Sequence, residues 1–323
     1  MPVKAYTVLF LFTLFLSCKK ETLQIVATPV SVPTTLTLNK IIFTDAQHGF
    51  IAGGDRYSAV VVLSCSGLST PWKIVQLPET TEKREAYDIE SNPQGHIAIC
   101  GYGGTFYYST DTGNTFQYYQ HSSWSSLRAM AYCTQHQLAI VEGHSFSKGF
   151  LSWFEPTSKQ LSNKQQEWNF ECSDICFPDA STGYISGYGA VLKSIDSGLH
   201  WTYTAAKNDF FKSMFWNNSM EGIAVGYEGT IIKTYDGGES WSVIRNGNSM
   251  WQKKIHLLQV AGLQNGTMVA VGESGVAMLS RDHGAHWEYI KKFTSNDLRG
   301  VAFSDEHTCW ICGSGGSLFR LPV

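Results

Sequence analysis

The sequence predicts an all-β fold: a seven-bladed β-propeller of four-stranded antiparallel blades, whose ring is closed by an N-terminal strand. Three observations predict it. A short turn motif recurs at intervals of about one blade, a glycine-bearing hairpin precedes each copy, and seven apolar segments are spaced as innermost strands. The composition agrees, because only 16% of the residues are charged and 30 glycines suit a fold with many tight turns.

The turn motif consists of Ser or Thr, then Asp two residues on, Gly two residues after that, and an aromatic residue at the end. Asp196, Asp236 and Asp282 follow one another at intervals of 40 and 46 residues. The Asp carboxylate can accept hydrogen bonds from N–H groups two residues on, Gly supplies a positive φ, and the Trp ring can fold back onto the hairpin. We therefore expect structural roles for the motif residues, which are Asp111, Gly113, Asp196, Gly198, Trp201, Asp236, Gly238, Trp241, Asp282, Gly284 and Trp287.

Hairpins with paired glycines precede the motif copies, as in Gly101-Tyr-Gly-Gly104. No helix and no Lys-Ser/Thr pair follows them, so they predict β-hairpins and not phosphate loops. Tyr102, Tyr188 and Tyr227 recur after the hairpin glycine, where packing between blades and ligand stacking are both open. The seven expected innermost strands are 40–43, 86–89, 129–132, 174–177, 213–216, 255–258 and 300–303.

The last blade ends after its third expected strand, 317–321, and needs a fourth strand from elsewhere. Residues 22–26 (Thr-Leu-Gln-Ile-Val) are a spare β-prone segment near the N-terminus. We expect this segment to pair with the last strand, because closure of the ring leaves no exposed edge between the first and last blades.

The N-terminal residues are typical of an export signal. Lys4 precedes an apolar run over residues 8–16, and Ser17 is followed by Cys18, as in the lipobox of bacterial lipoproteins. The sequence predicts a lipoprotein signal peptide over 1–17, lipidation of Cys18, an anchor, linker and closing strand over 18–37, and a propeller over 38–323. A diacylglyceryl anchor would hold the protein on a membrane of the cell envelope, at the outer membrane or the periplasmic face, without spanning it. A plain signal peptide is the alternative.

The cysteines do not predict a metal site. Cys172 and Cys176, and also Cys309 and Cys312, resemble half-sites in spacing, but residues i and i+3 of a strand lie on opposite faces. We expect buried cysteines with no metal and no cofactor. An export compartment permits a disulfide, and Cys172 could reach Cys176 only if the strand bends there.

A candidate ligand site comes from the position just ahead of each expected innermost strand. Four of the seven residues there are basic although the net charge of the chain is −3. A ring of these cations around the channel would suit an acidic peptide, a carboxylate or a glycan, and the alternative is that they are solvated strand ends. The seven positions are Asn39, Glu85, Arg128, Ser173, Lys212, Lys254 and Arg299.

The glycine hairpins, the turn motif with Gly238-Glu-Ser-Trp241 and the segment Leu298-Arg-Gly-Val-Ala-Phe303 resemble the photosystem II stability/assembly factor family of seven-bladed propellers. The resemblance covers about residues 40–321 and implies a role as an assembly chaperone. An arginine-rich patch implicated in partner binding in that family matches Arg128 and Arg299 best. Similar domains also occur in non-photosynthetic bacteria.

The turn motif also resembles the Asp-box, or bacterial neuraminidase repeat, of sialidases. Sialidases grip the substrate carboxylate with three arginines and use an acidic residue and a Tyr nucleophile paired with Glu. This chain has seven arginines, and Arg281 lies inside a turn motif. Phe319-Arg320-Leu321-Pro322 resembles a sialidase motif that belongs ahead of the repeats, but here it ends the chain.

We therefore expect a non-catalytic, monomeric cell-envelope lipoprotein that serves as a protein-interaction or assembly scaffold. An envelope protein or an acidic peptide is the expected partner. The small net charge argues against nucleic acid. The alternative is a glycan-binding or glycan-cleaving, sialidase-like protein.

Overall fold

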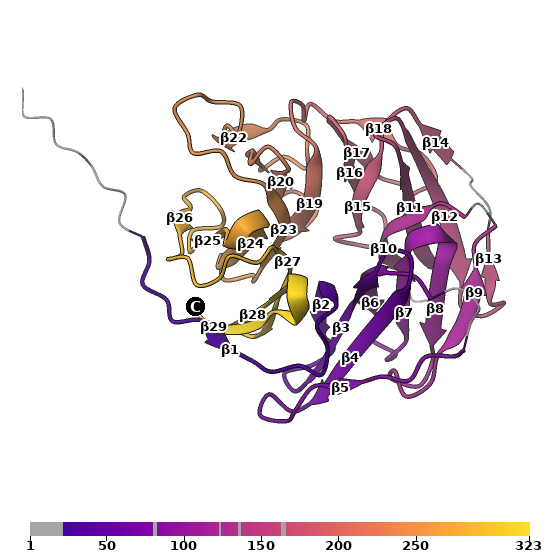
Figure 1. Cartoon of the computed structure of the whole chain (residues 1–323). Coiled ribbons are helices and arrows are strands. Elements are labelled where there is room, and N and C mark those ends of the chain that lie inside the picture. The colour runs from indigo at the N-terminus through magenta and orange to yellow at the C-terminus, as the bar shows by residue number, and fades with distance from the viewer. Residues whose placement is uncertain (1–21, 80–82, 123, 135–136, 163–165) are drawn as a thin grey trace, which may run out of the picture.

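Seven antiparallel sheets surround a central channel in the computed structural model (Figure 1). The structure describes residues 22–79, 83–122, 124–134, 137–162 and 166–323. Within these ranges no helix is long and apolar enough to cross a bilayer. The predicted fold class, a seven-bladed β-propeller of antiparallel blades, is confirmed.

The first four blades follow one another along the chain, each built from the channel outward. Blade one contains β2 (Thr37–Phe43), β3 (His48–Asp55), β4 (Ala59–Ser66) and β5 (Lys73–Ile74). Blade two contains β6 (Ala86–Ser91), β7 (Ile97–Gly101), β8 (Thr105–Ser109) and β9 (Gln117–Gln120). Blade three contains β10 (Ser126–Thr134), β11 (Gln137–His144), β12 (Lys148–Glu155), β13 (Gln160–Leu161) and β14 (Gln166–Trp168). Blade four contains β15 (Cys172–Cys176), β16 (Gly183–Gly187), β17 (Ala190–Ser194) and β18 (Thr202–Tyr203).

The last three blades complete the ring. Blade five contains β19 (Phe211–Trp216), β20 (Gly222–Gly226), β21 (Ile231–Thr234) and β22 (Ser242–Arg245). Blade six contains β23 (Leu257–Gly262), β24 (Met268–Gly272), β25 (Ala277–Ser280) and β26 (Glu288–Tyr289). Blade seven contains β27 (Leu298–Asp305), β28 (Thr308–Gly313), β29 (Leu318–Pro322) and the N-terminal β1 (Thr28–Pro29). Short 3₁₀ turns occupy three hairpin tips: Tyr102–Gly104, Glu273–Gly275 and Ser314–Gly316.

The hydrophobic core lies between neighbouring blades. One cluster joins Ile223 and Val225 of blade five to Leu257 and Met268 of blade six, and all four are buried. The second strand of most blades is buried along its whole length, as β20 and β24 show. Apolar residues therefore fill both faces of each central strand, so each blade depends on its neighbours.

The predicted innermost strands overlap the observed ones in every blade, but the register is wrong in blade six. The prediction began that strand at Ile255, whereas β23 begins at Leu257 and extends to Gly262. Ile255 is buried in the approach to the strand and does not belong to it. The apolar run beginning at Ile255 therefore mixes a buried connection with the strand itself.

Closure of the ring by an N-terminal strand is confirmed, but the predicted segment is wrong. Thr28 pairs with Arg320 and Pro29 with Phe319, and the Val30 N–H donates to the Leu318 carbonyl at 2.8 Å. Since neighbouring residues of a strand alternate, the Pro29 nitrogen faces away from β29, where no donor is needed.

The predicted segment, Thr22–Val26, lies beside blade six instead. Leu23 forms a parallel bridge with Ile290, and the Leu23 N–H donates to the Tyr289 carbonyl at 2.9 Å. Leu23 and Ile25 pack on the cluster that joins blades six and seven. The apolar side chains that make this segment β-prone cover a seam between two blades.

The four motif segments form the same turn, with one difference from the expected bonding. The Gly238 N–H donates to Thr234 Oγ1 at 2.9 Å, and Thr234 Oγ1 donates to Asp236 Oδ1 at 2.8 Å. Asp236 accepts from the Ser240 N–H, four residues on and not two, at 2.9 Å. Gly238 has a φ of +86°, in the left-handed region that favours glycine. These turns join the third and fourth strands, at the end of the blade opposite the glycine hairpins.

Candidate binding site at the channel mouth

A β-bulge lies near the start of every innermost strand. In each blade the register between the first and second strands shifts near the start of the first strand, at a residue that has no partner opposite it. A bulge bends its strand and re-aims the side chain of the extra residue. We call these seven positions the bulge ring: Asn39, Tyr87, Arg128, Ser173, Lys212, Leu258 and Arg299.

All seven residues of the bulge ring line one cavity of about 220 Å³ at the channel mouth. Arg56, from the tip of the β3–β4 hairpin, and Glu85, from the approach to β6, line it as well. The hairpin tips and the bulges therefore lie at the same end of the blades. Repetition of the blade thus brings side chains that are far apart in the sequence into one site.

The structure brings together three of the four basic residues expected there. Arg128, Lys212 and Arg299 line the cavity, but Lys254 does not. Lys254 lies in a separate depression with His256 and Glu273, and its Nζ donates to the Gly247 carbonyl at 2.8 Å. Because β23 starts later than predicted, Leu258 occupies the ring position in blade six.

One further ring residue and one cation were not predicted from the sequence. In blade two the ring residue is Tyr87, two positions after the predicted Glu85, although Glu85 also lines the cavity. Arg56 contributes from a hairpin tip, outside the positions just ahead of the innermost strands. No local feature of the sequence marks Tyr87, because the bulge is set by the pairing of β6 with β7.

The two ring arginines keep free hydrogen-bonding capacity. Arg128 donates through Nη2 to Glu171 Oε1 at 2.7 Å, and its guanidinium carbon lies 5.3 Å from the centre of the Tyr87 ring. Arg299 Nη2 lies 3.7 Å from Asp297 Oδ2. The Nε atoms of Arg128 and Arg299 are both buried without a hydrogen-bond partner. Buried donors of this kind favour an incoming acceptor.

Lys212 is the electrostatically perturbed member of the ring. Its Nζ lies 4.0 Å from the centre of the Phe210 ring. Burial, reinforced by the charges of Arg128 and Arg299, lowers the pKa of Lys212 to about 8. A cation held among other cations is stabilised by any anion that enters the cavity.

A charged layer lies just inside the bulge ring. Lys40 Nζ lies 3.1 Å from Asp88 Oδ1 and 3.5 Å from Glu90 Oε1. Asp88 also accepts the Met130 N–H at 2.7 Å, so it joins blade two to blade three. Burial raises the pKa of Asp174 to about 6, against the opposing effect of Lys40. These acids stabilise the channel wall through ion pairs and hydrogen bonds. They lie just beneath the place where an anion would bind at the mouth.

Two aromatic clusters flank the mouth. Phe146, Tyr188 and Phe210 pack with ring centres 5.6–6.0 Å apart, and Tyr188 is 53% exposed. The second cluster contains Tyr57 and Tyr102, 5.3 Å apart. Tyr102 and Tyr188 therefore pack between loops of neighbouring blades, whereas Tyr227 stacks on His256 with ring centres 4.3 Å apart.

The cysteines take no part in the mouth. All seven in the described chain are unpaired. Cys309 and Cys312 belong to different hydrophobic clusters, as the strand geometry predicted. Burial raises the pKa of Cys312 to about 12. Among the described residues, no group of His, Cys, Asp and Glu is arranged to hold a metal ion. Cys18 lies outside the described residues.

The fold and the mouth together define a class: seven-bladed propellers with a ring of inward-facing side chains at one end of the channel. No known protein-family profile matches the chain, and no curated protein matches it by sequence. Solved structures do match in fold. A structure titled "YCF48 bound to D1 peptide" has a TM-score of 0.69 at 14% identity and covers 92% of this chain and 95% of its own.

Other propellers match as well. YCF48 from Cyanidioschyzon merolae has a TM-score of 0.70 at 14% identity, covering 92% of this chain and 98% of its own. Virginiamycin B lyase from Staphylococcus aureus has a TM-score of 0.74 at 11% identity, covering 93% of this chain and 100% of its own. At such identities the likeness shows the propeller fold, which both interaction proteins and a lyase adopt.

Proposed function

We propose that this protein is a non-catalytic interaction or assembly scaffold of the bacterial cell envelope, which binds an acidic segment of a partner protein at the channel mouth. The observation that carries the proposal is the convergence of Arg128, Lys212 and Arg299 on one cavity, although the whole chain has a net charge of −3. Local concentration of cations steers and holds an acidic ligand.

Two further observations support this proposal. The buried Nε donors of Arg128 and Arg299 lack partners, which a ligand carboxylate would supply. A protein of similar fold, YCF48, has been solved with a D1 peptide. The lipobox-like Ser17-Cys18 supports a membrane location for the scaffold.

Binding of acidic peptides tests the mouth. We expect an Asp- or Glu-rich peptide to bind the mature protein, and Arg128→Ala with Arg299→Ala to weaken binding by at least about tenfold, because hydrogen bonds to charged groups contribute about 1.5–3 kcal/mol. Titration calorimetry measures the affinity. Lys254→Ala is the matched control, since Lys254 does not line the cavity. Equal affinity in the double variant and the control would rule out the mouth as the site.

Lipidation of Cys18 and fractionation of the protein with membranes test the envelope location. We expect the wild-type protein to incorporate radiolabelled fatty acid and to fractionate with membranes, and Cys18→Ser to do neither. Export of an unlabelled wild-type protein would instead fit the plain signal peptide.

A glycan ligand is the second candidate, and one observation favours it. Three arginines, Arg56, Arg128 and Arg299, line the same cavity as Tyr87 and Glu85. That set could bind the carboxylate of an acidic sugar. However, burial and the charge of Glu85 raise the pKa of Tyr87, which disfavours the phenolate of a nucleophile. We expect no sugar release from sialosides, and binding of free sialic acid without acidic-peptide binding would favour this candidate over the first.

A further inference from the structure

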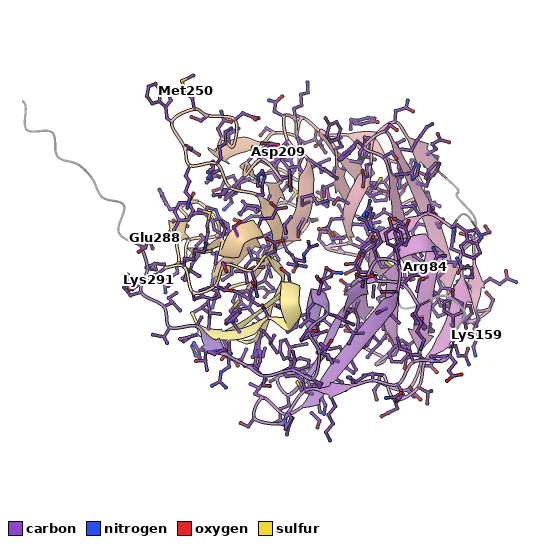
Figure 2. The ribbon with its side chains drawn as sticks, viewed as in Figure 1. Arg84, Lys159, Asp209, Met250, Glu288 and Lys291 are labelled. Atoms are coloured by element: carbon purple, nitrogen blue, oxygen red, sulfur yellow. The ribbon has the colours of Figure 1, made fainter. Side chains whose placement is uncertain are left out.

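We infer that the rim of blades five and six is a membrane-docking surface that rests on an anionic lipid bilayer. The inference rests on the proposed lipid anchor at Cys18. We call the surface the rim patch and define it by Met250, Trp251, Lys253, Lys254, Lys291 and Lys292. Figure 2 shows Met250, Glu288 and Lys291 along the side of the molecule where the described chain begins.

The apolar part of the rim patch lies on the connection from β22 to β23. Met250 and Trp251 are 83% and 89% exposed, the two highest values among the exposed large apolar side chains of the described chain. An exposed Trp next to Met is costly in water and is typical of a membrane interface, where an amphipathic ring lies at headgroup level. Trp251 also borders a hollow lined by Trp287 and Ile244.

The connection that carries these residues is held in place by the blade. The buried guanidinium of Arg245 donates to the carbonyls of Gly229 and Lys253. Asn248 Nδ2 donates to the Asn208 carbonyl at 2.9 Å. Met250 and Trp251 are therefore presented by a loop whose two ends are fixed, and their exposure is a property of the folded protein.

The cations of the rim patch come from two segments. Lys253 and Lys254 end the loop, Lys291 and Lys292 follow β26, and all four are exposed. Lys253, Lys254 and Lys292 line one depression. The acidic residue that lines this depression is Glu273, which accepts from the Tyr227 hydroxyl at 3.2 Å. Three lysines against one glutamate give this depression a positive charge on a chain of net charge −3, which suits anionic headgroups.

The short segment between the proposed lipid anchor at Cys18 and Thr22 would bring the bilayer close to this rim. Thr22 lines the same depression as Lys253, Lys254 and Lys292, and Leu23 is bridged to Ile290. Cys18 precedes Thr22 by four residues, and four residues span at most about 14 Å when fully extended. Lys19 and Lys20 fall in the same short span. The anchor and the exposed Trp251 can therefore engage one bilayer surface together.

Vesicle binding without the anchor tests the rim patch separately from the lipid. The protein is the mature chain from residue 18 with Cys18→Ser, which contains every described strand. We expect it to co-sediment with phosphatidylcholine vesicles that contain phosphatidylglycerol, more weakly with phosphatidylcholine alone, and less at high salt. Met250→Ala with Trp251→Ala, and separately a change of the four lysines to Gln, should each lower the partition coefficient by at least about tenfold.

Trp124→Ala is the matched control, because Trp124 is also exposed and lies beside Arg84, on the other side of the molecule in Figure 2. It should bind vesicles as the parent does. An unchanged midpoint of thermal unfolding shows that each variant is folded. Absence of vesicle binding by the parent, or equal binding by parent and both rim variants, overturns the inference. Neither result bears on acidic-peptide binding at the mouth or on the lipidation of Cys18, which are tested separately.

Discussion

At the scale of single residues, one bulge position decides what each blade presents to the channel. Arg128, Lys212 and Arg299 were placed there correctly from the sequence, because the expected strand in each of these blades begins one residue after the bulge. Lys254 was not, because it precedes β23 by three residues. The candidate site was therefore predictable where the sequence marks the start of the innermost strand clearly. It was not predictable in blade six, where the apolar Ile255 precedes the strand.

Lys212 makes the site sensitive to pH. With its pKa lowered to about 8 by burial and neighbouring cations, it is charged below that pH and neutral above it. We expect affinity for an acidic peptide to fall as the pH rises through about 8, by about tenfold, since one charge-assisted hydrogen bond is lost. Titration calorimetry from pH 7 to pH 9 measures it. Lys212→Arg keeps its charge and should abolish the dependence, and an unchanged pH profile in that variant would contradict this assignment.

At the scale of elements, the turn motif was read almost completely from the sequence. The spacing of its residues predicts the position of the hydroxyl, the carboxylate and the glycine with positive φ in one turn. The turn depends on residues within a span of eight, so neighbouring blades hardly alter it. The β-bulges, in contrast, arise where an inner strand meets its partner, and a single strand carries no local signal for them.

The hydroxyl of the motif is the sensitive part of that turn. Thr234→Val keeps the shape of the side chain but removes the acceptor for the N–H of Gly238, which is buried. We expect a loss of about 1–3 kcal/mol in the free energy of unfolding, the cost of an unsatisfied buried donor. Urea denaturation measures it. Thr35→Val, at an exposed position, is the control, and a loss of the same size there would refute the role given to the hydroxyl.

At the scale of the whole molecule, the ring is held closed by a strand of only two residues. β1 pairs with β29, and the segment before it covers the seam between blades six and seven. The chain thus joins its two ends through both hydrogen bonds and apolar packing. Such closure protects the edge of β29 from pairing with another molecule.

Removal of the closing segment should open the ring. A chain that begins at residue 31 loses β1 together with Leu23 and Ile25. We expect its free energy of unfolding to fall by about 1–3 kcal/mol, because Leu23 and Ile25 are partly buried and a fully buried large apolar side chain contributes about 1.5–3 kcal/mol. Thermal and urea denaturation measure the change. A chain that begins at residue 22 is the control, and equal stability of the two chains would exclude a closing role.

The sequence alone determined the fold class, the number of blades, the turn motif and the need for a closing strand. Each of these follows from a repeated local pattern or from a count of strands. Only the tertiary structure decided that Thr28–Pro29 closes the ring, and that Arg128, Lys212 and Arg299 share the mouth with Arg56 and Tyr87 but not with Lys254. The physical reason is that pairing between distant strands sets the register, and a shift of one or two residues changes which side chains enter the channel.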